Sequence, residues 1–286
     1  MANFDCIVIG KGPAGISTAI YVVTAGNTCM VVGGEASALV RAESISNYYG
    51  IDGISGPELF RRGEAQARAL GAEVVDGEVV AVTMTGEGFE VVLASGERHG
   101  ARTVVLACGV KRERARAKGL AEFDGRGVSY CAVCDGFLYR DSEVAVLGAG
   151  AYAKEEAEHL VRIGCKVTVF TGGDELDVPG ARVIREEVAE VKGDRRVRSV
   201  VAGGVEYGVS CVFVAVGRAG AADFARTVGL MQDGEYVVVD KAMMTNCPGI
   251  FACGDAIGGF LQVSTAVGEG ALAGRGVNQY LKNLNK

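Results

Sequence analysis

The chain has 286 residues, of which 49% are hydrophobic and 22% charged, a balance that indicates packed domains and excludes extensive disorder. Its net charge of −6 argues against nucleic acid as the main partner. No apolar run reaches the length of a membrane span, and the first residues show no basic segment of a signal peptide. We therefore expect a cytoplasmic protein that contacts no membrane and whose nine cysteines are mostly buried and reduced.

The N-terminal region is predicted to form a strand, a glycine turn, a helix and a second strand. The apolar run 6–9 leads into GKGPAG at residues 10–15, a helical stretch continues to about residue 24, and residues 28–32 resemble a strand. This order carries the G-x-G-x-x-G pattern of dinucleotide-binding folds. Its glycines permit a tight turn, a close pyrophosphate and a helix packed closely on the strand, and the positive end of the helix faces the phosphates.

The rest of the first half adds more strands and then a cysteine pair. Three runs between residues 73 and 93 resemble antiparallel strands, and a buried strand over residues 103–108 ends at Gly109. The segment CAVCDG at residues 131–136 has the C-x-x-C spacing of a reversible disulfide or of half a metal site.

A zinc site is the rival interpretation of the cysteine pair, and the sequence argues against it. A closed structural site needs a second pair of ligands. Cys247 and Cys253 are poorly spaced for that purpose, and His99 and His159 form no pair. We therefore expect no metal site.

The strand–turn–helix–strand order then returns. Residues 144–147 lead to GAGAYA at residues 148–153, followed by a helix through residue 163 and a strand over residues 166–170. Four positions align between the two copies without a gap: Gly10, Gly12, Gly15 and Gly26 with Gly148, Gly150, Ala153 and Gly164. Two such copies in register predict two dinucleotide-binding domains.

Seven short motifs follow one another along essentially the whole chain: GKGPAG, NYYG, LACGV, CAVCDG, GAGAYA, FVAVGR and PGIFACGD. In this order they resemble the motifs of the low-molecular-weight thioredoxin reductases. The resemblance implies an α/β protein with two Rossmann-like, three-layer ββα domains, the second inserted into the first. Residues 1–111 and 245–286 would form the FAD-binding domain, and residues 112–244 the redox-disulfide domain. Such enzymes are FAD-containing homodimers that reduce thioredoxin.

The resemblance also implies roles for individual residues. Cys134 would face the flavin, Cys131 would attack the thioredoxin disulfide, and Asp135 would act as acid and base. Asn47 would lie near the flavin, and Gln262 with Val263 would border its ring. The remaining residues expected to bind FAD are Gly10, Gly12, Pro13, Ala14 and Gly15 at the pyrophosphate, Gly254 and Asp255 at the ribityl-phosphate end, and Gly34, Glu35, Leu39 and Gly109.

The second nucleotide site departs from the family pattern. Members that use NADPH carry a basic cluster of the form HRR after the second strand of the inserted domain, where this chain has TGGDELD at residues 171–177. Three acids there would repel the 2′-phosphate of NADPH. The glycine turn carries Tyr152, whose ring either obstructs the pyrophosphate or points outward. We interpret this turn as a degenerate nucleotide site, formed by Gly148, Gly150, Tyr152 and Ala153.

These departures leave the electron donor open. A related branch of thioredoxin reductases takes electrons from ferredoxin, keeps FAD and C-x-x-C and lacks the basic cluster, so reduced ferredoxin is the favoured donor. The alternatives are the same enzyme driven by NADH or NADPH, and a flavin-containing redox sensor or electron carrier. The basic segment 111–118 is either a solvated linker or a docking patch for an acidic electron-transfer partner.

Overall fold

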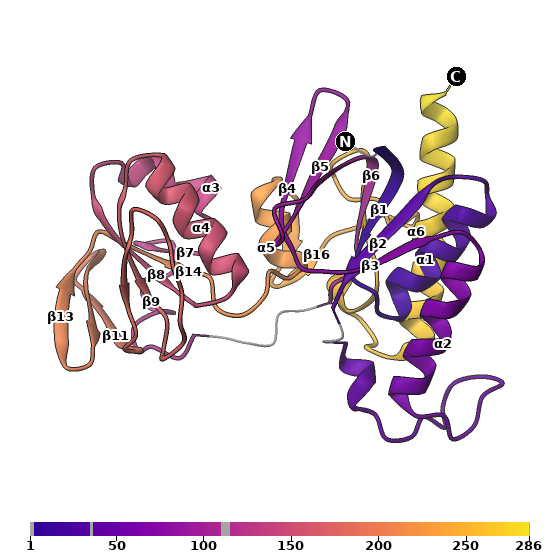
Figure 1. Ribbon diagram of the computed structural model, residues 1–286, viewed down its shortest axis with the longest axis horizontal. Helices are drawn as coiled ribbons and strands as arrows, with labels where there is room; N and C mark the ends of the chain where they lie inside the picture. The colour runs from indigo at the N-terminus through magenta and orange to yellow at the C-terminus, as the bar shows by residue number, and fades with distance from the viewer. Residues whose placement is uncertain (1–2, 35–36, 110–114, 286) are drawn as a thin grey trace. The chain divides into compact units, whose positions relative to one another are not determined.

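The chain forms two compact units (Figure 1). The outer unit combines residues 1–110 with residues 220–286, and the inserted unit is the continuous stretch 111–219. Among the residues described, no helix is both long and apolar enough to cross a membrane. The computed structural model describes residues 3–34, 37–109 and 115–285.

The outer unit is built on a seven-stranded sheet in the order β3-β2-β1-β6-β5-β4, with β17 paired to β6. Its strands β1, β2, β3, β6 and β17 pair in parallel, whereas β4 and β5 form an antiparallel hairpin that continues from β6. The strands are β1 (Asn3–Ile9), β2 (Cys29–Gly33), β3 (Glu73–Asp76), β4 (Val79–Thr85), β5 (Gly88–Leu93), β6 (Arg98–Leu106) and β17 (Ile250–Ala252).

One predicted pairing is wrong. The run that begins at Glu73 was expected to be antiparallel, but it forms β3, which pairs in parallel with β2. The chain reaches β3 through the helix α2 (Gly56–Ala69), and a helical crossover of this kind returns the next strand in the same direction. A four-residue apolar run carries no information about its direction, so the crossover helix was the signal that mattered.

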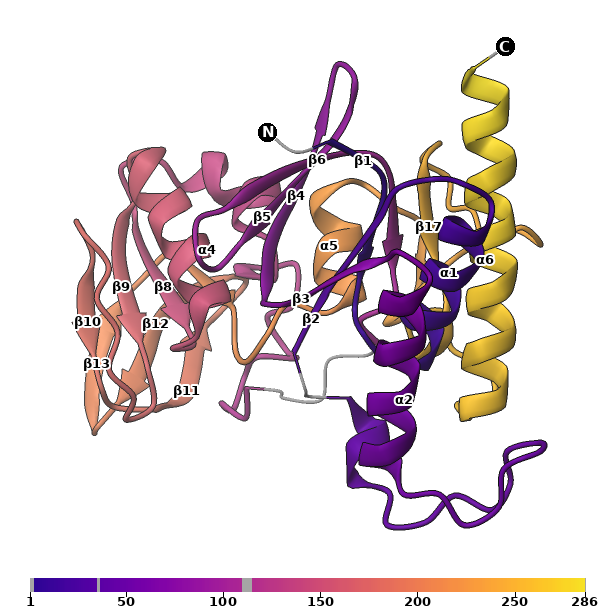
Figure 2. The ribbon, with the colours of Figure 1, turned by 45° about the vertical axis from the view of Figure 1, so that its right-hand side comes forward.

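Three helices cover one face of the outer sheet: α1 (Pro13–Thr24), α2 and α6 (Val263–Leu284) (Figures 1 and 2). Their apolar side chains join those of the parallel strands in one core. The core contains Val8 and Val31 from the sheet, Ala19 from α1 and Val277 from α6, all fully buried. This layer holds α1, and with it the glycine turn, in place against the sheet.

Glycines let α1 and α6 approach closely. A Cβ on Gly270 of α6 would overlap the carbonyl oxygen of Ala14, and one on Gly274 would lie 2.7 Å from the Cβ of Tyr21. Thr18 fastens the same crossing, because its hydroxyl donates to the carbonyl of Gly270 at 3.1 Å. The first turn of α1 is therefore positioned by a backbone contact that admits no side chain.

The second boundary of the inserted unit differs from the prediction. Residues 220–244 were expected in the inserted domain, but they belong to the outer unit. The helix α5 (Ala221–Thr227) contacts β4, and a small hairpin contacts the turn η3 (Gly254–Ile257). A seven-residue helix and two-residue strands have too little periodicity to show which core they join. The hairpin strands are β15 (Gln232–Asp233) and β16 (Tyr236–Val237).

The inserted unit has three layers. Its central five-stranded sheet, in the order β10-β9-β8-β14-β7, is entirely parallel, and a separate antiparallel sheet runs β11-β12-β13. The strands are β7 (Val128–Ser129), β8 (Glu143–Leu147), β9 (Lys166–Phe170), β10 (Arg182–Ile184), β11 (Val188–Gly193), β12 (Val197–Ala202), β13 (Val205–Gly208) and β14 (Cys211–Val214). The helical elements are α3 (Ala132–Asp135), η2 (Gly136–Tyr139) and α4 (Ala151–Arg162).

Alternate residues of β8 face opposite layers. Val144 and Val146 join the core beneath α4, whereas Ala145 and Leu147 join the core shared with the antiparallel sheet. A strand buried on both faces explains the unbroken apolar run that the sequence shows there. The predicted fold class, an α/β protein with two dinucleotide-binding domains, is confirmed.

The α1–α6 crossing generates a matched pair of predictions. Gly270→Ala places a methyl group against the backbone of α1 and is expected to lower the free energy of unfolding by about 1–3 kcal/mol, as overpacking does. Gly63→Ala adds the same methyl group to α2, where it would meet only the side chain of Ile16 at an ordinary 3.4 Å, and it should be neutral or stabilise by about 0.5–1 kcal/mol. Denaturant unfolding measures both, and equal effects at the two positions would contradict the packing described.

Candidate active site

The glycine turn at the end of β1 is shaped for a ligand. Gly10 has φ +115°, and a Cβ there would overlap the carbonyl of Ala107 at the end of β6. Gly12 differs from Gly10, because a Cβ there would meet only the hydroxyl of Ser37, at 3.7 Å. The absence of a side chain at Gly12 leaves space beside the turn open. Gly15 lies against the carbonyl of Gly10 and lets α1 pack on β1. Gly10 and Gly15 thus serve the tight turn and the close packing that the sequence predicted, and the pyrophosphate contact of Gly12 stays a prediction.

The first turn of α1 carries no side-chain cap. Gly12 is its N-cap, Pro13 occupies its first turn, and no acidic side chain lies in that turn. Backbone N–H groups at a helix start need partners, and the helix dipole favours an anion there. The open, uncapped turn therefore fits a pyrophosphate.

Distant segments of the chain meet beside this turn. Gly254 has φ +69°, and a Cβ there would lie 2.7 Å from the Cβ of Ala14. A Cβ on Gly109 would lie 3.8 Å from the Cβ of Asp255. The structure thus brings Gly109, Gly254 and Asp255 to the glycine turn, as a shared cofactor site requires.

The predicted flavin neighbours also come together. The side-chain amide of Asn47 donates to the side-chain oxygen of Gln262 at 3.1 Å. Leu39, in the short helix η1 (Ala38–Arg41), is buried in a small cluster against which Val263 packs. Gly34 follows β2 directly, whereas Glu35 lies outside the described residues.

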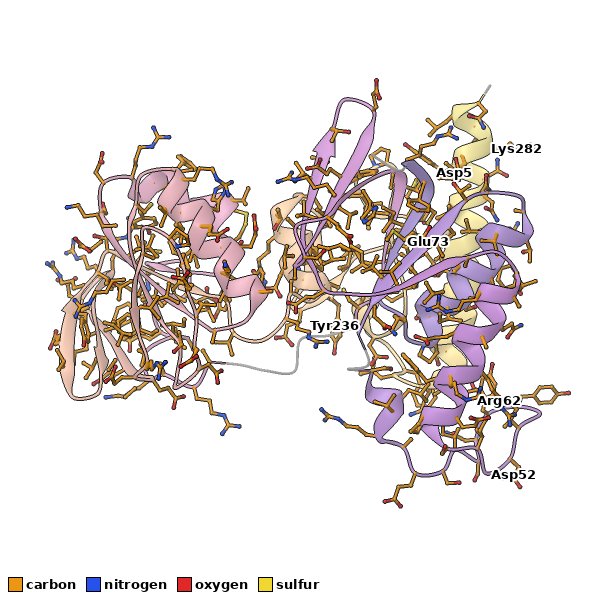
Figure 3. All side chains as sticks on the ribbon, in the orientation of Figure 1. Asp5, Asp52, Arg62, Glu73, Tyr236 and Lys282 are labelled. Carbon is orange, nitrogen blue, oxygen red and sulfur yellow. A yellow bond between two sulfur atoms is a disulfide. The ribbon has the colours of Figure 1, made fainter. Side chains whose placement is uncertain are left out.

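Sequence reasoning missed three residues at this site. Glu269 of α6 accepts the N–H of Gly254 at 2.9 Å, and burial raises the pKa of its carboxyl. The second is Tyr236, labelled in Figure 3. A Cβ on Gly258 would lie 2.9 Å from its ring. Neither residue stands in a motif, so only the fold reveals it.

The third missed residue is Lys11, inside the glycine turn itself. It is 4% exposed and forms ion pairs with Glu64 of α2, at 2.7 Å, and with Asp76 of β3. Burial alone would lower the pKa of Lys11, but its hydrogen bonds to Asp76 and Glu64 outweigh burial and raise it. The charged group thus ties the turn to two neighbouring elements.

The inserted unit carries the cysteine pair. Cys131 and Cys134 form a disulfide at the start of α3, where Cys131 is the N-cap and its sulfur accepts the N–H of Cys134 at 3.1 Å. Cys131 is 3% exposed, and Cys134 is partly exposed. Of the two interpretations of the C-x-x-C spacing, the structure adopts the disulfide. No group of three or more His, Cys, Asp or Glu side chains placed to hold a metal occurs in the part of the chain that the structure describes.

Ser129 connects Asp135 to this disulfide. Its hydroxyl donates to the carboxylate of Asp135 at 2.7 Å and accepts the N–H of Cys131 at 3.2 Å. Asp135 follows Cys134 directly, and its N–H donates to the carbonyl of Cys131 at 3.2 Å. The carboxylate is therefore fixed to the segment that carries the cysteines, and its role as acid and base stays a prediction. Sequence reasoning missed Ser129, although it lies only two residues before Cys131.

Comparison with known proteins identifies the family. Residues 4–270 match the model of the pyridine nucleotide-disulphide oxidoreductases. A thioredoxin reductase of Listeria innocua is 35% identical over 99% of this chain and 95% of its own length, and one of Aquifex aeolicus is 34% identical over the same shares. The chain belongs to the thioredoxin reductases of this family. These enzymes are flavoproteins that bind FAD, and the open glycine turn fits that cofactor.

Two solved structures resemble this thioredoxin reductase closely. An atypical thioredoxin reductase from Desulfovibrio vulgaris Hildenborough is 35% identical, with a TM-score of 0.93 and 98% of each chain covered. A ferredoxin-flavin thioredoxin reductase from Clostridium acetobutylicum is 30% identical, with a TM-score of 0.75 and 100% of each chain covered.

The second glycine turn has the same backbone arrangement as the first, but it carries the large side chain of Tyr152. Gly148 has φ +143°, and a Cβ there would overlap the carbonyl of Ala215 and press on Ala153. Gly150 caps α4 without a side chain. Tyr152 is 4% exposed and donates its hydroxyl to the carbonyl of Tyr130 at 3.3 Å. The ring lies in the core beneath α4 and does not point out into solvent, and its obstruction of a pyrophosphate stays a prediction.

The loop after β9 carries its acids as the sequence showed, and one of them is paired. The guanidinium of Arg185 forms an ion pair with Glu175, and the hydroxyl of Thr171 donates to the carbonyl of Asp174 at 2.7 Å. Gly172 and Gly173 have φ of +70° and +112°.

The basic segment 111–118, interpreted as a solvated linker or a docking patch, is described only from residue 115 onward, so its first half lies outside the described residues. Within the described part, Lys118 pairs with Glu190 at 2.7 Å on the surface.

The ion pairs of Lys11 generate a prediction. Lys11→Met leaves the Glu64 carboxylate without its cation, and we expect the free energy of unfolding to fall by about 3 kcal/mol, with weaker retention of FAD. Lys118→Met removes an ion pair at an exposed position and should leave both quantities nearly unchanged. Thermal unfolding and the flavin-to-protein absorbance ratio test this; equal losses in both variants would show that Lys11 has no special role.

Proposed function

We propose that this thioredoxin reductase receives its electrons from reduced ferredoxin and not from NADPH. The observation that carries the proposal is the loop after β9, where relatives that use NADPH place their basic cluster. A 2′-phosphate needs free cations there. The loop offers instead the carboxylates of Asp174, Glu175 and Asp177, and the nearby Arg185 is already engaged by Glu175.

The backbone of this loop supports the same conclusion. Gly172 and Gly173 adopt positive φ, a region in which side chains such as arginine are strained. Basic residues at these positions would therefore require another loop conformation. The similarity to a ferredoxin-flavin thioredoxin reductase adds independent support.

The proposed chemistry is thiol–disulfide exchange at Cys131 and Cys134. When bound and reduced, the flavin would supply the two electrons that open the disulfide. The Cys131 thiolate then attacks the thioredoxin disulfide, forms a mixed disulfide and releases one thioredoxin thiol. Cys134 attacks the sulfur of Cys131, which releases reduced thioredoxin and restores the intramolecular disulfide. Asp135, held by Ser129, takes up and returns the proton.

We also propose that the chain is a homodimer, as the family resemblance implies. A groove between α1 and α6 exposes the apolar side chains of Tyr21 and Leu272, which are 50% and 42% accessible. A second copy covering this groove would remove both from water. Light scattering after size exclusion is expected to give twice the mass of one chain.

The experiment that tests the electron donor is anaerobic bleaching of the flavin. FAD-loaded enzyme is mixed with NADPH, NADH or reduced ferredoxin, and flavin absorbance is followed by stopped flow. We expect fast bleaching with ferredoxin and bleaching slower by at least about 10³-fold with NADPH, because the missing phosphate contacts leave the carboxylates to repel it. Fast bleaching by NADPH would refute the proposal, and fast bleaching by NADH alone would transfer the donor role to NADH.

A further inference from the structure

The helix α4 holds the redox disulfide through two buried side chains. Tyr152, in its first turn, donates its hydroxyl to the carbonyl of Tyr130 at 3.3 Å. Glu156, one turn later, accepts the N–H of Ala132 at 2.6 Å. Tyr130 and Ala132 are the sequence neighbours of Cys131, so the two hydrogen bonds hold the peptide groups on either side of that cysteine.

Both side chains are nearly enclosed, at 4% exposed for Tyr152 and 7% for Glu156. Residues four apart lie on the same face of a helix, which is why both reach the same segment. A buried hydrogen bond restrains the groups it joins, because breaking it leaves a polar group without a partner and away from water. The bond to Glu156 is also short, as expected for an N–H that donates to a carboxylate.

We propose that Tyr152 and Glu156 form a clamp that positions Cys131 for closure of the disulfide. Tyr152 occupies the turn that would face phosphates in a dinucleotide-binding unit. In this chain, the first turns of α4 therefore bind the segment that carries the disulfide. The clamp acts on Cys131 whichever donor feeds the flavin, so the inference does not depend on the ferredoxin proposal.

A positioning role has a measurable consequence. Closing the disulfide is an intramolecular reaction, and its equilibrium depends on how well the two thiols are held together. With dithiothreitol as the reductant, the protein S–S bond breaks, two electrons and two protons pass to Cys131 and Cys134, and cyclic oxidised dithiothreitol forms. A looser clamp gives the dithiol more freedom and shifts this equilibrium toward the reduced protein.

The first test is Tyr152→Phe, which removes one hydroxyl and keeps the ring. We expect the equilibrium constant for reduction by dithiothreitol to rise about two- to tenfold, the range that one hydrogen bond spans. The FAD-loaded enzyme is equilibrated anaerobically and quenched by acid, and the 131–134 peptide is quantified by mass spectrometry. Tyr207→Phe is the matched control, because Tyr207 lies in the same unit and its ring packs on Phe170.

The second test is Glu156→Gln, which keeps the size of the side chain and an acceptor oxygen but removes the charge that strengthens the bond to Ala132. The equilibrium constant should shift in the same direction. Glu155→Gln, on the neighbouring position of α4, should leave it unchanged. The clamp is refuted if Tyr152→Phe and Glu156→Gln both stay within twofold of the wild-type constant, or if the two controls shift it equally.

Discussion

Each unit depends on one glycine that lets the chain turn against the end of a neighbouring strand. At Gly10 a side chain would collide with the carbonyl of Ala107, and at Gly148 with that of Ala215. Gly10 follows β1 and precedes α1, and Gly148 follows β8 and precedes α4. The same steric constraint, met twice, fixes where α1 and α4 begin and therefore which groups their first turns present.

The two units use this shared geometry for different purposes. The first turn of α1 stays free of side-chain caps and faces a cradle completed by Gly109, Gly254 and Asp255. The first turn of α4 is occupied by Tyr152, which reaches the segment that carries the disulfide. One unit thus offers an anion site, and the other supports the proposed exchange chemistry. This division accounts for a thioredoxin reductase that keeps its FAD cradle and lacks the basic cluster for NADPH.

The sequence predicted the features that depend on local pattern. The glycine turns, the parallel strands around them and the cysteine pair all follow from spacing and residue type. The motifs also led to Asn47 and Gln262, which the structure joins by a hydrogen bond although more than 200 residues separate them.

What the sequence did not reveal depends on tertiary contact. Lys11 and Glu156 are buried and Glu269 is partly buried, and each contacts a partner in a different element of the fold. A polar residue within a helix looks the same whether it faces solvent or a buried amide. The assignment of residues 220–244 was missed for the same reason, because short elements take their place from the core they contact.

In the mechanism proposed above, electrons reach thioredoxin from the flavin through Cys131 and Cys134 without a nucleotide in the inserted unit. The most direct measurement is a single turnover. FAD-loaded enzyme is reduced by light under anaerobic conditions, mixed with oxidised thioredoxin in the absence of any nucleotide, and the thioredoxin thiols are counted. We expect one thioredoxin to be reduced for each pair of electrons, and Cys131→Ser to abolish the transfer. Transfer that begins only after NADPH or NADH is added, or that survives in Cys131→Ser, would contradict this mechanism.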